Sequence, residues 1–352
     1  MNNKIIIING PNLNLLGERE QSQYGSITFE KLKANCLKKA KDLVDVAVKA
    51  GCDICKFQTY KAEKLFSTQI NQVNGYKNIH KIFKSMELPG EWHAELKNYC
   101  DYREIEFMST PFDEDSVDKL YKLGVKRFKI SGFESTDLRF IRYVASTGLP
   151  LIISAGIGTT LDFINKIIEN CKNEDNHDIT ILHCNNAYPT PITDTKLLTI
   201  PLIRKTYNIP VGFSDHTTGI LAPSVAVALG AQVIEKHFTL SRKSKGLDHF
   251  FALEPLELKE MVNMIRDTEK MLDVKKDISE SEISNFQGQR SVIAKIEIKK
   301  GEILSDKNLS TKRPFYDGAV HAKDFFQLLD KKYTAKKNYK KDEIILWNQI
   351  MN

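Results

Sequence analysis

Two histidines follow short apolar runs at neighbouring points of the sequence and could hold a metal ion. His216 ends the run 211–216, and His237 follows the run 233–236. A buried parallel strand reads as an apolar run, and in a β/α barrel the functional residues lie just past its C-terminal end. Residues 219–230 are small and apolar with helical spacing, which predicts a strand–helix–strand unit. Two adjacent strands would then present both imidazoles at one site.

The alternative for either histidine alone is a hydrogen-bonded structural residue, which is the commoner role at a strand end. The presence of both histidines favours a metal site, as do three carboxylates that lie close to them in the sequence: Asp215, Glu235 and Asp248.

Two lysines, Lys56 and Lys129, lie inside apolar runs that should be largely buried. Most lysines are exposed, so the alternative is a solvated surface position. A buried lysine, however, needs an anionic partner, and a phosphorylated ligand is the simplest one. Hydroxyl and amide groups suited to phosphate and carboxylate oxygens are expected near the ends of the same runs. They belong to Ser109, Thr110, Ser154, Asn186, Tyr188 and Ser214.

Eight short apolar runs alternate with amphipathic segments over about the first 270 residues. This order predicts an α/β fold, a (β/α)₈ TIM barrel over residues 1–273, with an open doubly wound sheet as the alternative. The expected strands are 4–9, 53–58, 105–110, 127–131, 151–154, 179–184, 210–214 and 232–236. The expected helices are 29–50, 92–102, 115–123, 138–146, 160–170, 195–205, 223–229 and 255–272.

The alternation ends after this region. Residues 274–289 are rich in Lys, Asp, Glu, Ser and Asn, which indicates a linker. Residues 290–352 are β-rich and contain a weak internal repeat, so we expect a small second domain.

Bulk composition excludes several classes of protein. The 352 residues carry a formal charge of +6 without a dense basic stripe, so we expect no nucleic-acid partner. No apolar run approaches the roughly 20 residues that span a bilayer, so we expect no membrane partner. Six scattered cysteines fit a reducing cytoplasm, and Cys52 and Cys55 are expected to be core residues.

Several motifs together resemble the N-acetylneuraminate (sialic acid) synthases and the wider group that includes legionaminate and pseudaminate synthases. The resemblance runs from about residue 40 to the end of the chain. It is carried by residues 56–60, 109–113, 128–130, 182–191, 212–217, 235–239, 248–249 and 253–255, and by 312–314, which resemble the C-terminal antifreeze-like (SAF) domain of that family.

The resemblance implies that phosphoenolpyruvate condenses with an N-acyl amino sugar and water, giving a nine-carbon 2-keto acid and phosphate. It implies that His216 and His237 hold Mn²⁺ or Mg²⁺, and that Arg313 reaches the sugar from the partner subunit of a domain-swapped homodimer. The positions matching the family's phosphoenolpyruvate-binding residues are Lys56, Thr110, Lys129, Ser154, Asn186 and Ser214. Those matching residues near the sugar or the metal are Glu134, Tyr188, Asp248 and Glu235. Of these, the three carboxylates Glu134, Glu235 and Asp248 are the candidate catalytic groups.

Two departures leave the acceptor sugar open. Gly132 and Phe133 stand where the family usually has Ser-Gly before the glutamate, and Phe315-Tyr316 follow Arg313-Pro314 where glycine is usual.

The first forty residues resemble a different family, the type II 3-dehydroquinate dehydratases. The resemblance is carried by residues 8–20 with 24–25, and it implies active-site roles for Asn12, Arg19 and Tyr24. The glutamate that ends the first strand of the synthases is missing, and Glu18 or Glu20 could replace it. The chain thus resembles a splice within helix 29–50, with strand 4–9 in the first barrel position.

We therefore expect weakened or lost synthase activity on a retained fold. The alternatives are a legionaminate- or pseudaminate-type synthase, a dehydroquinate-type lyase, and a catalytically impaired sugar-phosphate binder.

Overall fold

A computed structural model describes the chain except for residues 1–3, 9–28, 71, 74–75, 245 and 273–277. The chain forms two compact units, Met1–Asp273 and Val274–Asn352. No helix in the described ranges is long and apolar enough to cross a membrane.

The first unit is built on one parallel sheet in the order β5-β2-β1-β10-β9-β8-β7-β6. Strand β1, at one end of the sequence, pairs with both β2 and β10, and the edge strands β5 and β6 also lie in contact. The sheet is therefore curved, with neighbouring strands following one another along the chain. The strands are β1 (Lys4–Ile8), β2 (Ile54–Thr59), β5 (Glu106–Pro111), β6 (Phe128–Ile130), β7 (Leu151–Ala155), β8 (Ile179–Cys184), β9 (Val211–Asp215) and β10 (Val233–Lys236).

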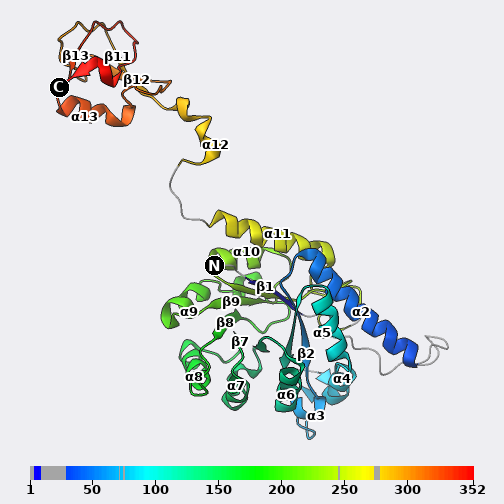
Figure 1. The fold of residues 1–352 in the computed structure, drawn as a ribbon. Coiled ribbons are helices and arrows are strands. Elements are labelled where there is room, and N and C mark those ends of the chain that lie inside the picture. Colours follow the sequence, from blue (N-terminus) through cyan, green and yellow to red (C-terminus); the bar gives the residue numbers. More distant parts are fainter. Residues whose placement is uncertain (1–3, 9–28, 71, 74–75, 245, 273–277) are drawn as a thin grey trace. The chain divides into compact units, whose positions relative to one another are not determined.

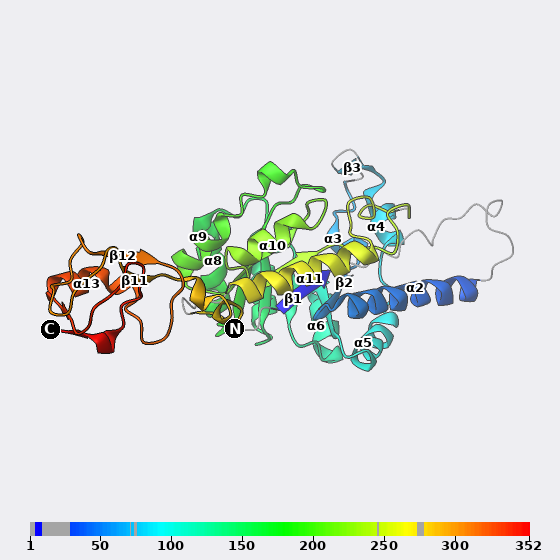
Figure 2. The same cartoon turned by 90° about the horizontal axis from the view of Figure 1, so that it is seen from above.

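Helices cover the outside of this sheet (Figure 1). The last helix of the unit packs beside α2 and α10, which Figure 2 shows from above. The covering helices are α2 (Phe29–Ala50), α5 (Trp92–Tyr102), α6 (Glu114–Leu123), α7 (Leu138–Ala145), α8 (Leu161–Lys172), α9 (Thr199–Tyr207), α10 (Leu221–Ala228) and α11 (Pro255–Met271).

Short polar residues fix where several of these helices begin. Asp113, Asp137 and Thr160 accept hydrogen bonds from backbone N–H groups in the first turns of α6, α7 and α8. Gly124 ends α6 in the left-handed conformation that glycine adopts without steric cost. Between sheet and helices lies the main apolar core, which includes the stacked rings of Phe57 and Phe107, 5.4 Å apart.

Small elements complete the first unit. Between β2 and α5 the chain forms α3 (Ala62–Leu65), the hairpin β3 (Gln72–Val73) and β4 (Tyr76–Lys77), and α4 (Ile79–Ser85). The two short 3₁₀ turns are η1 (Glu134–Thr136) and η2 (Ile192–Asp194).

The second unit has its own small core, which includes Val292, Val320, Leu328 and Tyr339. Its two antiparallel pairs are β11 (Ser291–Ala294) with β12 (Leu309–Lys312), and β13 (Thr334–Ala335) with β14 (Ile350–Met351). The remaining elements are α12 (Glu280–Ile283), η3 (Phe286–Gly288), η4 (Ala322–Asp324), α13 (Phe325–Asp330) and η5 (Trp347–Gln349).

The sequence placed all eight strands, but it ended several of them too early. Strands β2, β5, β7 and β9 each end one residue later than expected. Cys55 is buried and Cys52 is partly buried, as expected of core residues.

Candidate active site

The inside of the curved sheet is arranged in layers. Its floor is a small apolar cluster of Ile54, Met108, Ile152 and Leu182, against which Val233 packs. Side chains alternate between the two faces of a strand, so the residue two positions further on points into the same interior. On these five strands the next inward residues are Lys56, Thr110, Ser154, Cys184 and Glu235. A mostly polar layer therefore lies directly above the apolar floor.

Lys56 of this layer shares the carboxylate of Glu235 with Lys129, which reaches the layer from β6. Lys56 Nζ lies 3.7 Å from Glu235 Oε1, and Lys129 Nζ lies 3.0 Å from Glu235 Oε2. Burial lowers the pKa of Lys56 to about 7, although Glu235 opposes the shift. The pKa of Glu235 lies below its usual value, because the attraction of Lys129 and Lys56 outweighs its burial. The sequence suggested an anionic partner for the two buried lysines, and the structure pairs both of them with the carboxylate of Glu235.

Hydroxyl groups complete the surroundings of the two ammonium groups. Lys56 Nζ donates to Thr110 Oγ1 at 2.9 Å, and Lys129 Nζ donates to Ser154 Oγ at 2.6 Å. Ser214, on β9, is also buried. When Lys56 is protonated, the two ammonium groups outnumber the single carboxylate, so the polar layer is suited to an anion.

The two histidines stand one step above the polar layer. His216 and His237 follow the inward residues Ser214 and Glu235 by two positions, and their rings lie 5.3 Å apart. His216 Nδ1 lies 2.7 Å from the Asn185 carbonyl oxygen, and His237 Nδ1 lies 3.7 Å from Asp248 Oδ2. Burial lowers the pKa of both imidazoles, and for His237 the neighbouring His216 adds to the effect. Both rings are therefore held neutral, which is the form that binds metals.

The donor set fits a divalent cation. A hydrogen bond from Nδ1 to a backbone carbonyl leaves Nε2 of His216 available as a ligand, which is a common arrangement at metal sites. Among the described residues no group of three His, Cys, Asp or Glu side chains is gathered for a metal. His216 and His237 are the side chains here that would hold a cation.

Asp215 is not part of this constellation, although the sequence placed it there. It faces the opposite side of β9, where its Oδ2 lies 2.6 Å from Lys236 Nζ and both side chains are buried. Asp215 Oδ1 also accepts from the Thr217 N–H at 2.8 Å. The alternation of β9 and β10 therefore sends Asp215 and Lys236 outward, and Ser214 and Glu235 inward.

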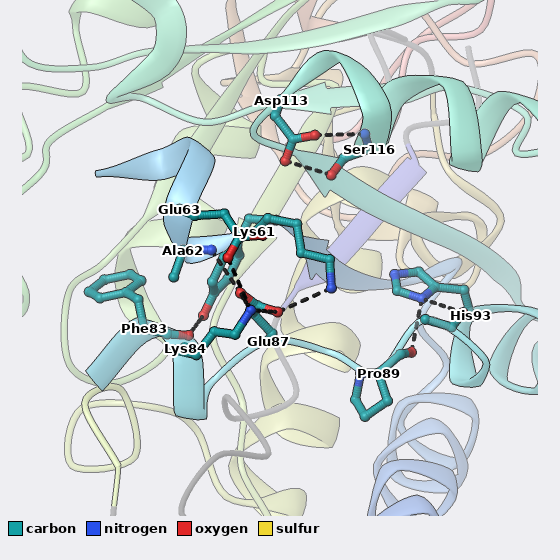
Figure 3. Close-up of polar contacts among 12 residues, drawn as sticks. Lys61, Ala62, Glu63, Phe83, Lys84, Glu87, Pro89, His93, Asp113 and Ser116 are labelled. Atoms are coloured by element: carbon teal, nitrogen blue, oxygen red, sulfur yellow. Dashed lines mark hydrogen bonds and ion pairs between the residues drawn. The ribbon is translucent and has the colours of Figure 1, made fainter. Parts of the chain in front are cut away.

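Ser109 likewise faces outward, away from the site. Its Oγ lies 2.7 Å from Thr59 Oγ1, which lies 2.8 Å from His93 Nε2 on α5. His93 Nδ1 is close to the carbonyl oxygen of Pro89, as Figure 3 shows. Burial lowers the pKa of His93 to about 4, so this chain of hydrogen bonds is a neutral structural link between sheet and helix.

The loops that follow β2 and β5 are also fixed by polar contacts (Figure 3). The carboxylate of Glu87 accepts from the Ala62 N–H at 2.8 Å and from Lys61 Nζ at 3.1 Å. After β5, Asp113 accepts from both the N–H and the hydroxyl of Ser116. These contacts hold the segments directly beyond Lys56 and Thr110.

Tyr188 and Asp248 lie beside the histidines, and Asn186 and Glu134 lie on the loops after β8 and β6. Asn186 Oδ1 accepts from the Ile157 N–H at 2.7 Å, and the ring of Tyr188 lies 4.2 Å from that of His216. Glu134 accepts from Ser131, and burial raises its pKa. Burial also raises the pKa of Asp248, to about 6.

Gly132 and Gly156 make room for the side chain of Asn186, a role that was not evident from the sequence. A Cβ atom on Gly156 would lie 2.0 Å from Asn186 Oδ1, and one on Gly132 would lie 2.8 Å from the same atom. The amide therefore packs directly against two loop backbones. The glycines are needed because the fold brings Asn186, which is distant from both in the sequence, against their backbones, and because Gly156 also packs on the backbone of Gly132.

Three sets of predicted residues lie elsewhere. Arg313 belongs to the second unit, where it follows β12. Asn12, Arg19, Tyr24, and the substitute carboxylates Glu18 and Glu20 lie outside the described residues.

Comparison with known proteins identifies two families in the chain. Residues 43–277 match the NeuB family, and residues 3–79 match the dehydroquinase class II family. Both resemblances found in the sequence are thereby confirmed. The two matches overlap within α2 and the segment after it, and β1, which belongs to the dehydroquinase-like part, pairs with β2 and β10.

Individual relatives agree with the longer match. The N,N'-diacetyllegionaminic acid synthase of Campylobacter jejuni is 39% identical over 316 residues, which cover 87% of this chain and 93% of the relative. The human N-acetylneuraminate-9-phosphate synthase is 32% identical and covers 83% of each chain.

Solved structures give the same result. The spore coat polysaccharide biosynthesis protein SpsE of Bacillus subtilis has a TM-score of 0.63 at 32% identity, over 99% of this chain and 96% of its own. The N-acetylneuraminic acid synthetase of Leptospira borgpetersenii has a TM-score of 0.68 at 29% identity, over 81% of this chain and 90% of its own. On this evidence the chain is an enzyme of the acid-synthase type and belongs to the NeuB family.

Proposed function

We propose that this enzyme condenses phosphoenolpyruvate with an N-acyl amino sugar and water to give a nine-carbon 2-keto sugar acid and phosphate. The observation that carries the proposal is the pair Lys56 and Lys129 on either side of Glu235, directly below two neutral imidazoles. The relatives named as sugar-acid synthases support the same reaction.

The polar layer would bind the phosphate and carboxylate of phosphoenolpyruvate. Lys56 and Lys129 neutralise its charge, and the hydroxyls of Thr110, Ser154 and Ser214 are within the same layer. Fixed donors in a buried site cost no reorganisation during the reaction, so they both position the substrate and stabilise developing charge.

The bond changes balance without another reactant. C3 of phosphoenolpyruvate forms a bond to the aldehyde carbon of the open-chain sugar, whose oxygen takes a proton. Water adds at C2, and the resulting tetrahedral carbon expels phosphate by cleavage of its C–O bond. The oxygen of that water becomes the keto oxygen of the product, and its protons leave with the new hydroxyl and with phosphate.

His216 and His237 are the residues that would hold the cation, Mn²⁺ or Mg²⁺. Bound there, it would supply Lewis-acid polarisation of the aldehyde oxygen. Glu235 lies between the two lysines and is ionised, so it can accept a proton from the attacking water. Asp248, with a pKa of about 6, and Glu134 line the acceptor side, where they can bond sugar hydroxyls.

The proposal also covers the folds of the two units and the assembly of the enzyme. We assign the first unit to a closed (β/α)₈ barrel and the second to an SAF-type domain. A domain-swapped homodimer would bring Arg313 of one subunit to the sugar bound by the other, and a cytoplasmic location remains a prediction.

One set of assays tests the proposal. The protein is incubated with phosphoenolpyruvate, Mn²⁺ and either N-acetylmannosamine or a diacetamido-trideoxy-mannose, and released phosphate is measured. Because the first-strand glutamate is missing, we expect weak phosphate release, and we expect it to be lost in His237→Ala and in Lys129→Met. In parallel, enone absorbance is followed with 3-dehydroquinate, because residues 3–79 match the class II dehydroquinases.

The outcomes separate the alternatives. Enone formation without phosphate release would replace the proposal with a lyase. Saturable binding of phosphoenolpyruvate without either reaction would indicate a sugar-phosphate binder, in agreement with the missing first-strand glutamate.

A further inference from the structure

Four exposed apolar side chains stand on the loops beyond the candidate site. Phe133, Ile157, Tyr188 and Phe250 have exposed fractions of 53%, 66%, 38% and 57%. They come from the loops after β6, β7, β8 and β10, so four separate segments contribute to one edge of the sheet. Single exposed apolar residues are ordinary, but a group around a polar site is typical of a ligand-binding groove.

This apolar rim is continuous with the two histidines. The ring of Phe133 is stacked on that of Tyr188, with centroids 6.4 Å apart and planes inclined by 20°. Tyr188 lies 4.2 Å from the His216 ring and 5.8 Å from the Phe251 ring, which in turn lies 5.2 Å from Phe250. A ligand that reaches the imidazoles therefore also meets aromatic faces.

Local contacts hold Phe133 in this place. Ser131 Oγ accepts from the Phe133 N–H at 3.3 Å while its own hydroxyl donates to Glu134, which closes a tight turn. Gly132 has no side chain, so the amide of Asn186 packs on the backbone of the turn. The side chain of Phe133 is exposed and lies beside Tyr188.

We infer that the rings of Phe133 and Tyr188 form a wall that binds the methyl groups of the acceptor sugar. This wall determines which acceptor sugar the enzyme prefers. The inference rests on the proposed function and specifies its acceptor side. The polar layer deep in the site suits the anionic substrate, whereas an aromatic wall favours C–H surface. Acyl methyl groups and a deoxy carbon supply that surface, and a fully hydroxylated chain does not. The enzyme therefore prefers an acceptor with two acetamido groups and a deoxy carbon over N-acetylmannosamine.

The test compares the two acceptors on the full-length protein with phosphoenolpyruvate and Mn²⁺. One methylene in an apolar pocket is worth about 10–200-fold in discrimination. We expect Phe133→Ala to lower the ratio of kcat/KM for the diacetamido-trideoxy-mannose over N-acetylmannosamine by about tenfold, through KM for the first sugar. Phe133→Tyr should restore the ratio. Tyr121→Ala, which removes another exposed ring on α6, should leave it unchanged.

A binding measurement makes the test independent of turnover. In saturation-transfer NMR, we expect the strongest transfer to the acetamido and deoxy methyl protons, and loss of that transfer in Phe133→Ala while ring protons keep theirs. If neither the ratio of kcat/KM values nor the methyl signal changes in Phe133→Ala, the inference about Phe133 and Tyr188 is wrong, while the proposed function is unaffected. If the unaltered protein neither binds nor converts either sugar, the proposed function falls and this inference with it.

Discussion

Lys236 Nζ lies 2.6 Å from Asp215 Oδ2, and this buried pair joins the ends of the two strands that carry the histidines. Lys236 also donates to the carbonyl oxygen of Thr217, and Asp215 accepts from the Thr217 N–H. The contacts thus enclose His216 on both sides, and Lys236 directly precedes His237. Burial lowers the pKa of Lys236 in spite of the attraction of Asp215. We infer that the pair positions the two imidazoles.

Replacing one member of this pair should lower the free energy of unfolding more than replacing both. Lys236→Met leaves Asp215 buried without its partner, and we expect a loss of about 3–5 kcal/mol in the free energy of unfolding. The double variant Asp215→Leu with Lys236→Met should recover most of that stability, because apolar replacement of a whole buried pair is often neutral. Urea denaturation measures the free energy of unfolding of both variants. The control is Lys270→Met, which removes an exposed ion pair with Asp267 and should lower that free energy by less than about 1 kcal/mol.

The same double variant separates positioning from stability. We expect its Mn²⁺ affinity, measured by electron paramagnetic resonance, to fall by about 10–100-fold, as for other groups that orient metal ligands. Unchanged Mn²⁺ affinity in a folded double variant would show that the pair only stabilises the sheet.

Binding of phosphoenolpyruvate should take up a proton in mildly alkaline solution. Burial holds the pKa of Lys56 at about 7, so its amine is mostly neutral at about pH 8.5 in the free protein. An anion favours the ammonium form and must therefore raise this pKa. We expect uptake of nearly one proton at that pH, measured by calorimetry in buffers of different ionisation enthalpy, and its disappearance in Lys56→Met. Heats that do not depend on the buffer would contradict the low pKa.

Asp248 should reduce stability at neutral pH. Its folded-state pKa of about 6 exceeds the ordinary value of 3.8, so the folded protein binds more protons than the unfolded chain between these values. Stability due to this group therefore falls as the pH rises towards 6, and the penalty is complete above it. We expect Asp248→Asn to stabilise the protein by up to about 3 kcal/mol at pH 7.5, and by less at pH 5. Urea denaturation at both pH values checks the sign, and phosphate release should fall in the same variant.

Gly156 should tolerate no side chain. A Cβ atom there would meet Asn186 Oδ1 at 2.0 Å and the carbonyl oxygen of Gly132 at 2.7 Å. We expect Gly156→Ala to cost about 1–3 kcal/mol in the free energy of unfolding and to weaken phosphoenolpyruvate binding. The matched control is Gly288→Ala, where no atom lies within 4 Å of the added carbon. Equal effects of the two substitutions would contradict the close packing around Asn186.

Much of the fold could be predicted because each strand has a simple local signal. An apolar run such as 179–184 is bounded by polar residues, and β8 (Ile179–Cys184) has those bounds. The hairpin of β3 and β4 has no comparable pattern, since each of its strands is two residues long.

The site could be predicted less completely, because residue type does not show which face of a strand a side chain occupies. Asp215 and Glu235 are both carboxylates beside a histidine, yet only Glu235 points inward. Glu235 on β10 pairs with Lys56 on β2 and Lys129 on β6, and these three strands are far apart in the sequence. Gly132 and Gly156 depend in the same way on Asn186.

The layered interior has a consequence for how the enzyme reaches its working state. Lys56, Thr110, Ser154 and Glu235 each lie two residues above an apolar floor residue, so a slip of one residue on any of these strands would turn its polar group outward. The binding site therefore forms only when all the strand pairings are correct together, and incompletely folded chains cannot bind the anion. Substrate then stabilises the finished enzyme alone, by RT ln(1 + [L]/Kd), so phosphoenolpyruvate added during refolding should raise the yield of native protein.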